Sequence, residues 1–207
     1  MSNVASPYGL KPVNLIGGQP YAGSVREVKL STNNTAGLFA GDVIQLSAAG
    51  NPQALTATIT TGTTAGVIGV MTGCRYTMPG TKQSMWSQFV PANAITGGYT
   101  DVYIFVADDP DLVMQVQGSA AFGSLTNGAA GAVGKNAALG NFSAGSTTTG
   151  NSGVNLVVGA NGGSLASTNT LAVRVIGVVP GTDLDTYPEL LVKWNMGAHS
   201  YNLATGV

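Results

Sequence analysis

The sequence predicts an all-β protein, and three observations support that fold class. Gly accounts for 30 of the 207 residues, about twice the usual share, and Pro for 9. Abundant Gly, Thr, Val and Asn with few Lys and Glu disfavour long helices and favour strands joined by turns. Short apolar runs recur between Gly- and Pro-containing turns, a spacing typical of sandwiches and barrels. We therefore expect a β-barrel or β-sandwich of about nine strands, with long Gly-, Thr- and Asn-rich loops.

The chain is expected to divide into an extended N-terminal arm, residues 1–23, and a single β-rich domain, residues 24–207. Pro7, Pro12 and Pro20 exclude regular helix from the arm and hold the preceding residues extended. The apolar side chains of the arm need a surface to lie on, which argues against a disordered terminus. We expect these side chains to contact another subunit or a partner protein. They are Tyr8, Leu10, Val13, Leu15, Ile16 and Tyr21.

Within the domain, β-branched and aromatic runs mark the strands. The run 101–107 has the clearest strand pattern, and 112–117 is expected to be its hairpin partner. The Thr-rich tract 56–66 is an edge strand or a surface loop, and one helical turn is expected near Ala120. The other expected strands are residues 26–30, 42–47, 67–71 extended by 74–76, 154–158, 171–179 and 190–194.

A short internal repeat links two of these strands. The segment 67–73, VIGVMTG, recurs as VIGVVPG at 175–181. A Gly inside a strand allows a close backbone approach or a bulge. The nearly continuous apolar character of both segments predicts burial on two faces. A duplicated half-barrel is the alternative interpretation, although the flanking residues do not match.

The scarcity of charge bears most directly on function. The chain has 8 Lys and Arg and 9 Asp and Glu, which is 8% of its residues, against roughly a quarter in an ordinary domain. Charged side chains are depleted at interface cores because their desolvation is costly. This composition therefore predicts a structural or interaction protein that packs against neighbours.

The same composition disfavours other partners. The net charge is −1 and the basic residues are scattered from Lys11 to Lys193, whereas nucleic-acid binding depends on clustered Lys and Arg. No stretch reaches the roughly 20 apolar residues of a membrane span, and the N-terminus has no secretory signal pattern. We expect no nucleic-acid or membrane partner and folding inside a cell.

The residues that could carry catalysis are few. His199 is the sole histidine and no G-x-S-x-G motif occurs, so a hydrogen-bonding surface or interface role is expected for His199. Cys74 lies in a predicted strand and is expected to be a small buried hydrophobe, although Arg75 beside it could lower its pKa. We expect no catalytic residue.

Three segments have features of ligand-binding sites. Residues 131–136 faintly resemble a phosphate loop, but such a loop needs Gly at position 129 and Ser or Thr at 136, and this chain has Ala129 and Asn136. The acidic groups at 108–111 and at Asp183 and Asp185 could bind Ca²⁺, but Asp-rich turns are the commoner explanation. We expect no metal and no cofactor.

Several short motifs occur in a characteristic order along the chain. They are residues 6–13, 20–23, 41–44, 108–110, 116–117, 134–137, 145–150, 174–177 and 191–195, together with Gly18. This order resembles that of a family of virion structural proteins from tailed bacteriophages, and it looks like the capsid cement, or decoration, class. The resemblance covers residues 6–47 and 101–199. In the Gly- and Ala-rich run from Ser119 to Gly134, residues cannot be matched one by one.

The resemblance implies a non-enzymatic, β-rich homo-oligomer, most often a trimer. It would be made in the host cytoplasm and would lie on the outer capsid surface of the virion, where it bridges subunits of the major capsid protein. An arm of some twenty extended residues could span roughly 60 Å of such a lattice.

One other class remains open. A head-fibre or adhesin-type β-sandwich that binds carbohydrate would use exposed aromatic side chains for stacking. The candidates are Trp86, Tyr99, Tyr103 and Trp194. Because most aromatic residues lie in predicted strands, core positions are the expected role for them. A hydrolase is the more distant alternative.

Overall fold

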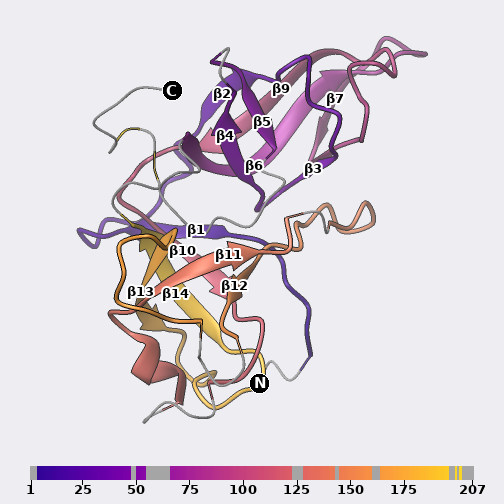
Figure 1. The fold of residues 1–207 in the computed structure, drawn as a ribbon. Coiled ribbons are helices and arrows are strands. Elements are labelled where there is room, and N and C mark those ends of the chain that lie inside the picture. Colours follow the sequence, from indigo (N-terminus) through magenta and orange to yellow (C-terminus); the bar gives the residue numbers. More distant parts are fainter. Residues whose placement is uncertain are drawn as a thin grey trace.

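A computed structural model describes residues 4–47, 50–54, 66–122, 128–142, 145–159, 164–195, 199 and 201. It confirms the all-β fold: the described residues form two six-stranded sheets and one two-stranded sheet, with a single 3-10 helix, η1, at Gly128–Ala132 (Figure 1). Neither large sheet closes on itself, and the arrangement is sandwich-like. The described residues contain fourteen strands, more than the nine expected, because several strands of two to five residues lack a recognisable pattern.

The first sheet lies in the lower half of Figure 1 and is antiparallel throughout. Burial alternates along the strand Glu189–Trp194, β14, as expected for a sheet with one face on a core. In order across the sheet, its strands are β1 (Lys11–Leu15), β10 (Leu112–Gln117), β14 (Glu189–Trp194), β13 (Val173–Val178), β11 (Asn136–Gly140) and β12 (Asn155–Val157).

The second sheet lies in the upper half of Figure 1. Its central strand is β6 (Val67–Thr77), which pairs with β9 (Thr100–Ala107) on one side. On its other side β6 pairs first with β4 (Val43–Leu46) and then with β7 (Ser84–Ser87). The remaining strands are β2 (Arg26–Lys29) beside β9, β5 (Pro52–Ala54) beside β4, and the separate pair β3 (Leu38–Phe39) and β8 (Phe89–Val90).

Strand β6 contributes to two hydrophobic cores. Val67 and Val70 pack into the first core, with the inward side chains of the first sheet. Ile68 and Met71 pack into the second core, under the second sheet. All of residues 67–71 are buried, so the predicted burial on two faces is confirmed for this strand. It is wrong for the repeat copy in β13, whose residues 176–178 are only half-buried.

The two repeat glycines have different roles. Gly69 has a φ of +152°, and a Cβ atom placed on it would lie 2.1 Å from the carbonyl oxygen of Ala107. This position therefore requires Gly for a close backbone approach. Gly177 lies at a register shift between β13 and β14, which is a bulge.

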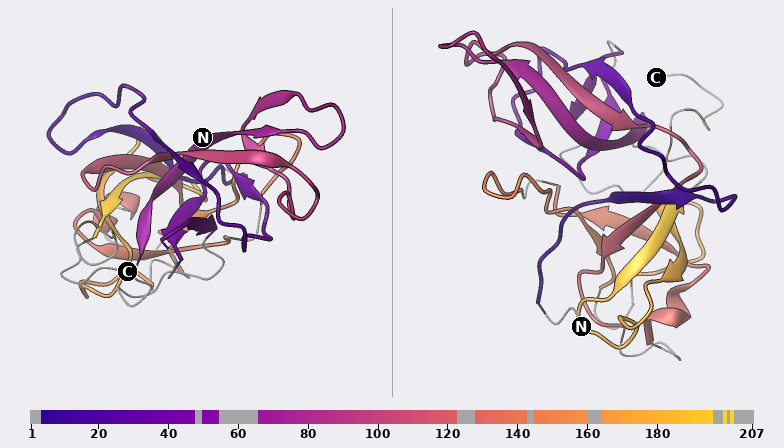
Figure 2. Two further views of the ribbon diagram at one scale, coloured as in Figure 1. Left: turned by 90° about the horizontal axis from the view of Figure 1, so that it is seen from above. Right: turned by 180° about the vertical axis from the view of Figure 1, so that it is seen from behind.

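The predicted hairpin between 101–107 and 112–117 is wrong. β9 lies between β2 and β6 in the second sheet, whereas β10 lies between β1 and β14 in the first. The right-hand view of Figure 2 shows the molecule from behind, with one sheet above the other. The Asp-rich turn between them carries the chain from one sheet to the other. Each strand thus gains a neighbour on both sides, which pairing with its sequence neighbour alone would not provide.

The N-terminal segment is not a free arm along its whole length. Lys11–Leu15 form β1, which pairs antiparallel with β10 at the edge of the first sheet. Leu10 is 1% exposed in the first core, and Leu15 and Tyr21 pack against that core. Pro12 is compatible with the strand because it lies at an edge, beside a register shift. The expected intermolecular role is therefore wrong for Leu10, while Val13 (41%) and Ile16 (50%) remain exposed.

Other local expectations meet different outcomes. Residues near Ala120 form no helical turn; Phe122 is buried in the first core, and the 3-10 helix begins at Gly128. Residues 56–65 of the Thr-rich tract lie outside the described residues.

The division of the chain into one domain and an N-terminal arm otherwise stays a prediction. No helix in the described part of the chain is long and apolar enough to cross a membrane.

Candidate functional site

The outer face of the second sheet carries a row of aromatic side chains. Along β9, Val102, Ile104 and Val106 point into the second core, so the intervening Tyr103 and Phe105 lie on the opposite, outer face. The pairing of β9 with β6 places Gly73 beside Phe105 and Arg75 beside Tyr103. The two-residue period of the strands therefore builds this face.

Trp86 on β7 completes the row. Its side chain is 70% exposed, and the strand pairs it with Arg75 of β6. The indole stacks on the ring of Phe105, with centroids 5.2 Å apart and planes 9° apart. Gly73 lies beside this pair, and an added Cβ there would lie 3.7 Å from the Phe105 ring, in ordinary van der Waals contact.

Two shallow hollows flank Trp86. One, of about 360 Å³, is lined by Tyr21, Gly23, Val25, Thr72, Trp86 and Phe105. The other, of about 350 Å³, is lined by Gly73, Cys74, Trp86, Ser87, Gln88 and Phe105. We call Tyr21, Val25, Trp86 and Phe105 the Trp86 patch. Contiguous exposed apolar patches of this kind mark interaction sites on soluble proteins.

The charges beside the patch are paired. Arg75 forms an ion pair with Glu27, and its guanidinium lies 4.2 Å from the centre of the Tyr103 ring. These groups are partly exposed, so the pair contributes little to stability. Because Arg75 and Glu27 pair with each other, neither of them places an unpaired charge next to the Trp86 patch.

The four predicted stacking residues do not form one site. Trp194 is 2% exposed and lies in the first core, while Tyr99 packs edge-on against Tyr76 in the second. Tyr103 lies under Arg75. The expected core role is thus correct for Trp194 and wrong for Trp86. No pattern in the sequence distinguished the exposed Trp86 from the buried Trp194, because the exposure of a residue on the edge strand β7 depends on which other strands cover it.

The predicted arm residues are also dispersed. Tyr21 joins the Trp86 patch, whereas Tyr8 is half-buried under the ammonium group of Lys11, and burial raises the pKa of its hydroxyl. Val13 and Ile16 are exposed near the edge of the first sheet. The six residues therefore do not make a common surface.

The expected surface or interface role for His199 is wrong, because its side chain is fully buried. His199 makes a bridge to Val67 of β6, and its ring lies 6.3 Å from that of Trp194. Its Nδ1 accepts a hydrogen bond from the backbone N–H of Tyr201 at 3.3 Å. Burial lowers the pKa of His199.

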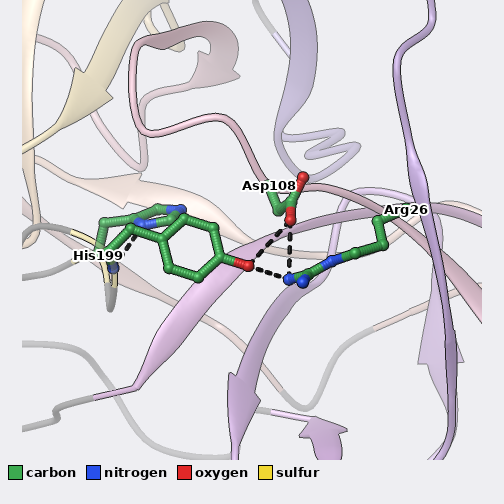
Figure 3. A network of polar contacts seen from close by, with 4 residues as sticks. Arg26, Asp108 and His199 are labelled. Atoms are coloured by element: carbon green, nitrogen blue, oxygen red, sulfur yellow. Dashed lines mark hydrogen bonds and ion pairs between the residues drawn. The ribbon is translucent and has the colours of Figure 1, made fainter. Parts of the chain in front are cut away.

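Tyr201 connects this histidine to a polar network (Figure 3). The Tyr201 hydroxyl donates to Oδ2 of Asp108 at 3.0 Å, and Arg26 binds the same carboxylate oxygen at 2.8 Å. Arg26 begins β2 and Asp108 follows β9, whereas His199 and Tyr201 follow β14 of the first sheet. The network therefore connects His199 and Tyr201 to Arg26 and Asp108 of the second sheet.

Cys74 and the acidic turn have structural roles. Cys74 is buried, its Sγ lies 3.3 Å from the Ser87 carbonyl oxygen, and burial raises the pKa of its thiol to about 12. Oδ1 of Asp109 accepts the backbone N–H of Asp111 at 2.8 Å, as in other Asp turns. No group of three His, Cys, Asp or Glu among the described residues is arranged to hold a metal ion. Asn136, in the segment compared with a phosphate loop, begins β11.

Asp42 is a polar residue of the interior that the sequence analysis did not single out. It is 5% exposed, accepts the backbone N–H of Phe39 at 2.7 Å and binds the hydroxyl of Ser152 at 2.5 Å. Burial raises its pKa to about 6. Its position just before an apolar strand and just after a Gly, in a chain with few acids, is the signal that could have identified it.

These features define an all-β protein whose prominent exposed site is an apolar aromatic face. No protein-family model, no curated protein and no solved structure matches the chain.

Proposed function

We propose that the chain is a non-enzymatic capsid cement, or decoration, protein of a tailed bacteriophage. It binds the outer surface of the assembled head and stabilises contacts between subunits of the major capsid protein. The observation that carries the proposal is the Trp86 patch, an exposed apolar surface on a chain with very few charges. The order of short motifs supports the same class.

The physical basis of the function is burial of the patch against the lattice. Apolar area removed from water contributes roughly 25 cal/mol per Å², and the pairing of Arg75 with Glu27 limits the desolvation cost of the charges beside the patch. A protein that binds only the assembled lattice stabilises it by mass action, about 2.7 kcal/mol per site at a hundredfold excess over Kd. Summed over many sites, this resists the internal pressure of a packaged genome.

The remaining parts of the proposal follow from the class. The partners are the major capsid protein and further copies of this chain, in a homo-oligomer expected to be a trimer. The location is the outer capsid surface of the virion. The chain acts without nucleic acid, membrane, metal or cofactor.

The test compares particles with and without this protein for genome release on heating. Fully decorated particles should release the genome at a higher temperature. Val25→Glu places a charge in the Trp86 patch and should weaken particle binding at least tenfold. Val133→Glu is the matched control, because Val133 is similarly exposed (47%, against 40% for Val25) and lies outside the patch. Equal release temperatures at full occupancy contradict the proposal.

A carbohydrate-binding head-fibre or adhesin module is the second candidate function, and the exposed indole of Trp86 favours it. A sugar ring stacks on an aromatic face but also needs polar groups around it. The hollow beside Trp86 offers mainly apolar side chains, so we rank this function second. Binding to immobilised glycans that Trp86→Ala abolishes, with no binding to particles, would reverse this order.

A further inference from the structure

The second sheet has one edge strand that lacks the usual protection against pairing. An exposed strand edge presents unpaired N–H and C=O groups to other chains, and native proteins block such edges with charge, Pro, bulges or covering segments. The edge strands of the two large sheets can be compared on this basis.

Four of the edges are protected. β1 contains Lys11 and Pro12 and has a register shift. β2 carries three charged side chains in four residues. β5 begins with Pro52, whose carbonyl accepts the N–H of Ser31 at 3.0 Å. The carbonyl of Leu156 in β12 accepts the N–H of Ser119 at 2.9 Å.

β7 has none of these features. Its sequence, Ser84-Met85-Trp86-Ser87, contains no charge and no Pro, and its first three residues are exposed. It pairs with β6 along one side. Within the part of the chain that the structure describes, residues 84–86 make no backbone hydrogen bond to any segment other than β6.

We propose that β7 pairs with β7 of a second copy of this chain, antiparallel and about a two-fold axis. The argument is complementarity of charge. A two-fold pair places each residue opposite its own kind or its near neighbours. In a charged strand such as β2, some registers then oppose like charges, as when an axis at Glu27 sets Glu27 against Glu27, and this is destabilising. β7 has no charge to oppose.

The register follows from the faces of the sheet. Residues directly opposite each other in an antiparallel pair share a face, so an axis at Trp86 places the two indoles opposite each other. Met85 then lies opposite Ser87 of the second copy. Aromatic cross-strand pairs are among the stabilising ones in sheets. This pairing joins the two outer faces into one surface and leaves Tyr21 and Val25 exposed for another partner.

The proposal does not rest on the proposed function, and its test uses the protein alone without particles. The molar mass of the protein in solution is measured by analytical ultracentrifugation for the wild type and for Trp86→Lys, over the micromolar range. Two lysines opposite each other repel, so the mass of Trp86→Lys should be half that of the wild type. Halving is expected for a dimer that becomes a monomer, and equally for six copies that become three.

Two controls make the outcome specific. Leu184→Lys introduces the same charge at an 85% exposed residue away from β7 and should keep the wild-type mass. A mixture of Trp86→Lys and Trp86→Glu should associate more tightly than either variant alone, because opposite charges then face each other across the axis. Equal masses for the wild type and Trp86→Lys, or a mixture that associates no better than its components, would overturn the two-fold contact.

Discussion

The carboxylate of Asp42 and the hydroxyl of Ser152 form a buried hydrogen bond of 2.5 Å between the two halves of the molecule. Asp42 immediately precedes β4 of the second sheet, and Ser152 lies shortly before β12 of the first. Gly9 and Gly41 approach each other beside this contact, where a Cβ on Gly9 would lie 2.7 Å from the Gly41 backbone. The sheets thus meet at a polar contact as well as at an apolar core.

Asp42→Asn should remove an acid-dependent part of the stability. Burial raises the pKa of Asp42 to about 6, above the value of about 3.9 in an unfolded chain, so the folded state holds the proton more tightly. The stability contributed by protonation is present below about pH 4 and lost as the pH rises through about 6. Urea unfolding of the wild type should show this decline and Asp42→Asn should not. An identical pH dependence in both proteins would contradict the role of Asp42.

Ser152→Ala should destabilise the fold by about 1–3 kcal/mol at neutral pH, because it leaves an ionised buried oxygen with one partner fewer. Its effect should be smaller at pH 4, where Asp42 is protonated. Chemical denaturation at the two pH values measures the difference, and a loss that does not depend on pH would indicate packing alone.

His199 should act in the opposite direction. Burial lowers its pKa below the unfolded value of about 6.5, so the unfolded state binds the proton more readily. The contribution of neutral His199 is fully present above that pH and is lost as the pH falls below it. His199→Asn should flatten the acid side of the profile, below the unfolded pKa of about 6.5, measured by urea unfolding. In Asp42→Asn, where the opposing group is absent, the decline toward acid due to His199 should be steeper than in the wild type.

Leu10→Ala should cost about 2–5 kcal/mol, the usual loss for a buried Leu. Ile16→Ala is the comparison, since Ile16 is 50% exposed and should change the stability by less than about 0.5 kcal/mol. Both residues lie in the segment that the sequence presented as an arm, so thermal unfolding of the two variants tests whether it belongs to the fold. Equal effects would support a free arm.

Gly69→Ala should be among the most destabilising single substitutions in the chain. The added methyl would lie 2.1 Å from the Ala107 carbonyl oxygen, and both atoms belong to paired strands that cannot move apart without breaking the sheet. We expect a loss above about 3 kcal/mol or failure to fold. Gly80→Ala meets no atom within 4 Å and is the matched control. A Gly69→Ala protein as stable as Gly80→Ala would contradict the close approach.

The sequence was sufficient for the fold class and for the longer strands, because β-branched and aromatic runs such as those of β6 and β9 favour strands. It was insufficient for β3, β5 and β8, which have two or three residues and owe their conformation to their partners. The sequence also did not reveal which strands pair with each other, since β9 and β10 are adjacent in sequence but lie in different sheets. The exposure of Trp86 depends on an edge that only the assembled sheet defines, and the burial of His199 on a bridge to β6.

The division of the β6 side chains between two cores has a mechanical consequence. A molecule with one core per sheet could lose either sheet separately, whereas withdrawal of β6 would remove Val67 and Val70 from one core and Ile68 and Met71 from the other. The same strand carries β7 at its far end. A partner bound at the edge near Trp86 would therefore contact a strand pair whose β6 side chains are buried in both cores. Hydrogen exchange throughout β6 should slow when that edge is occupied.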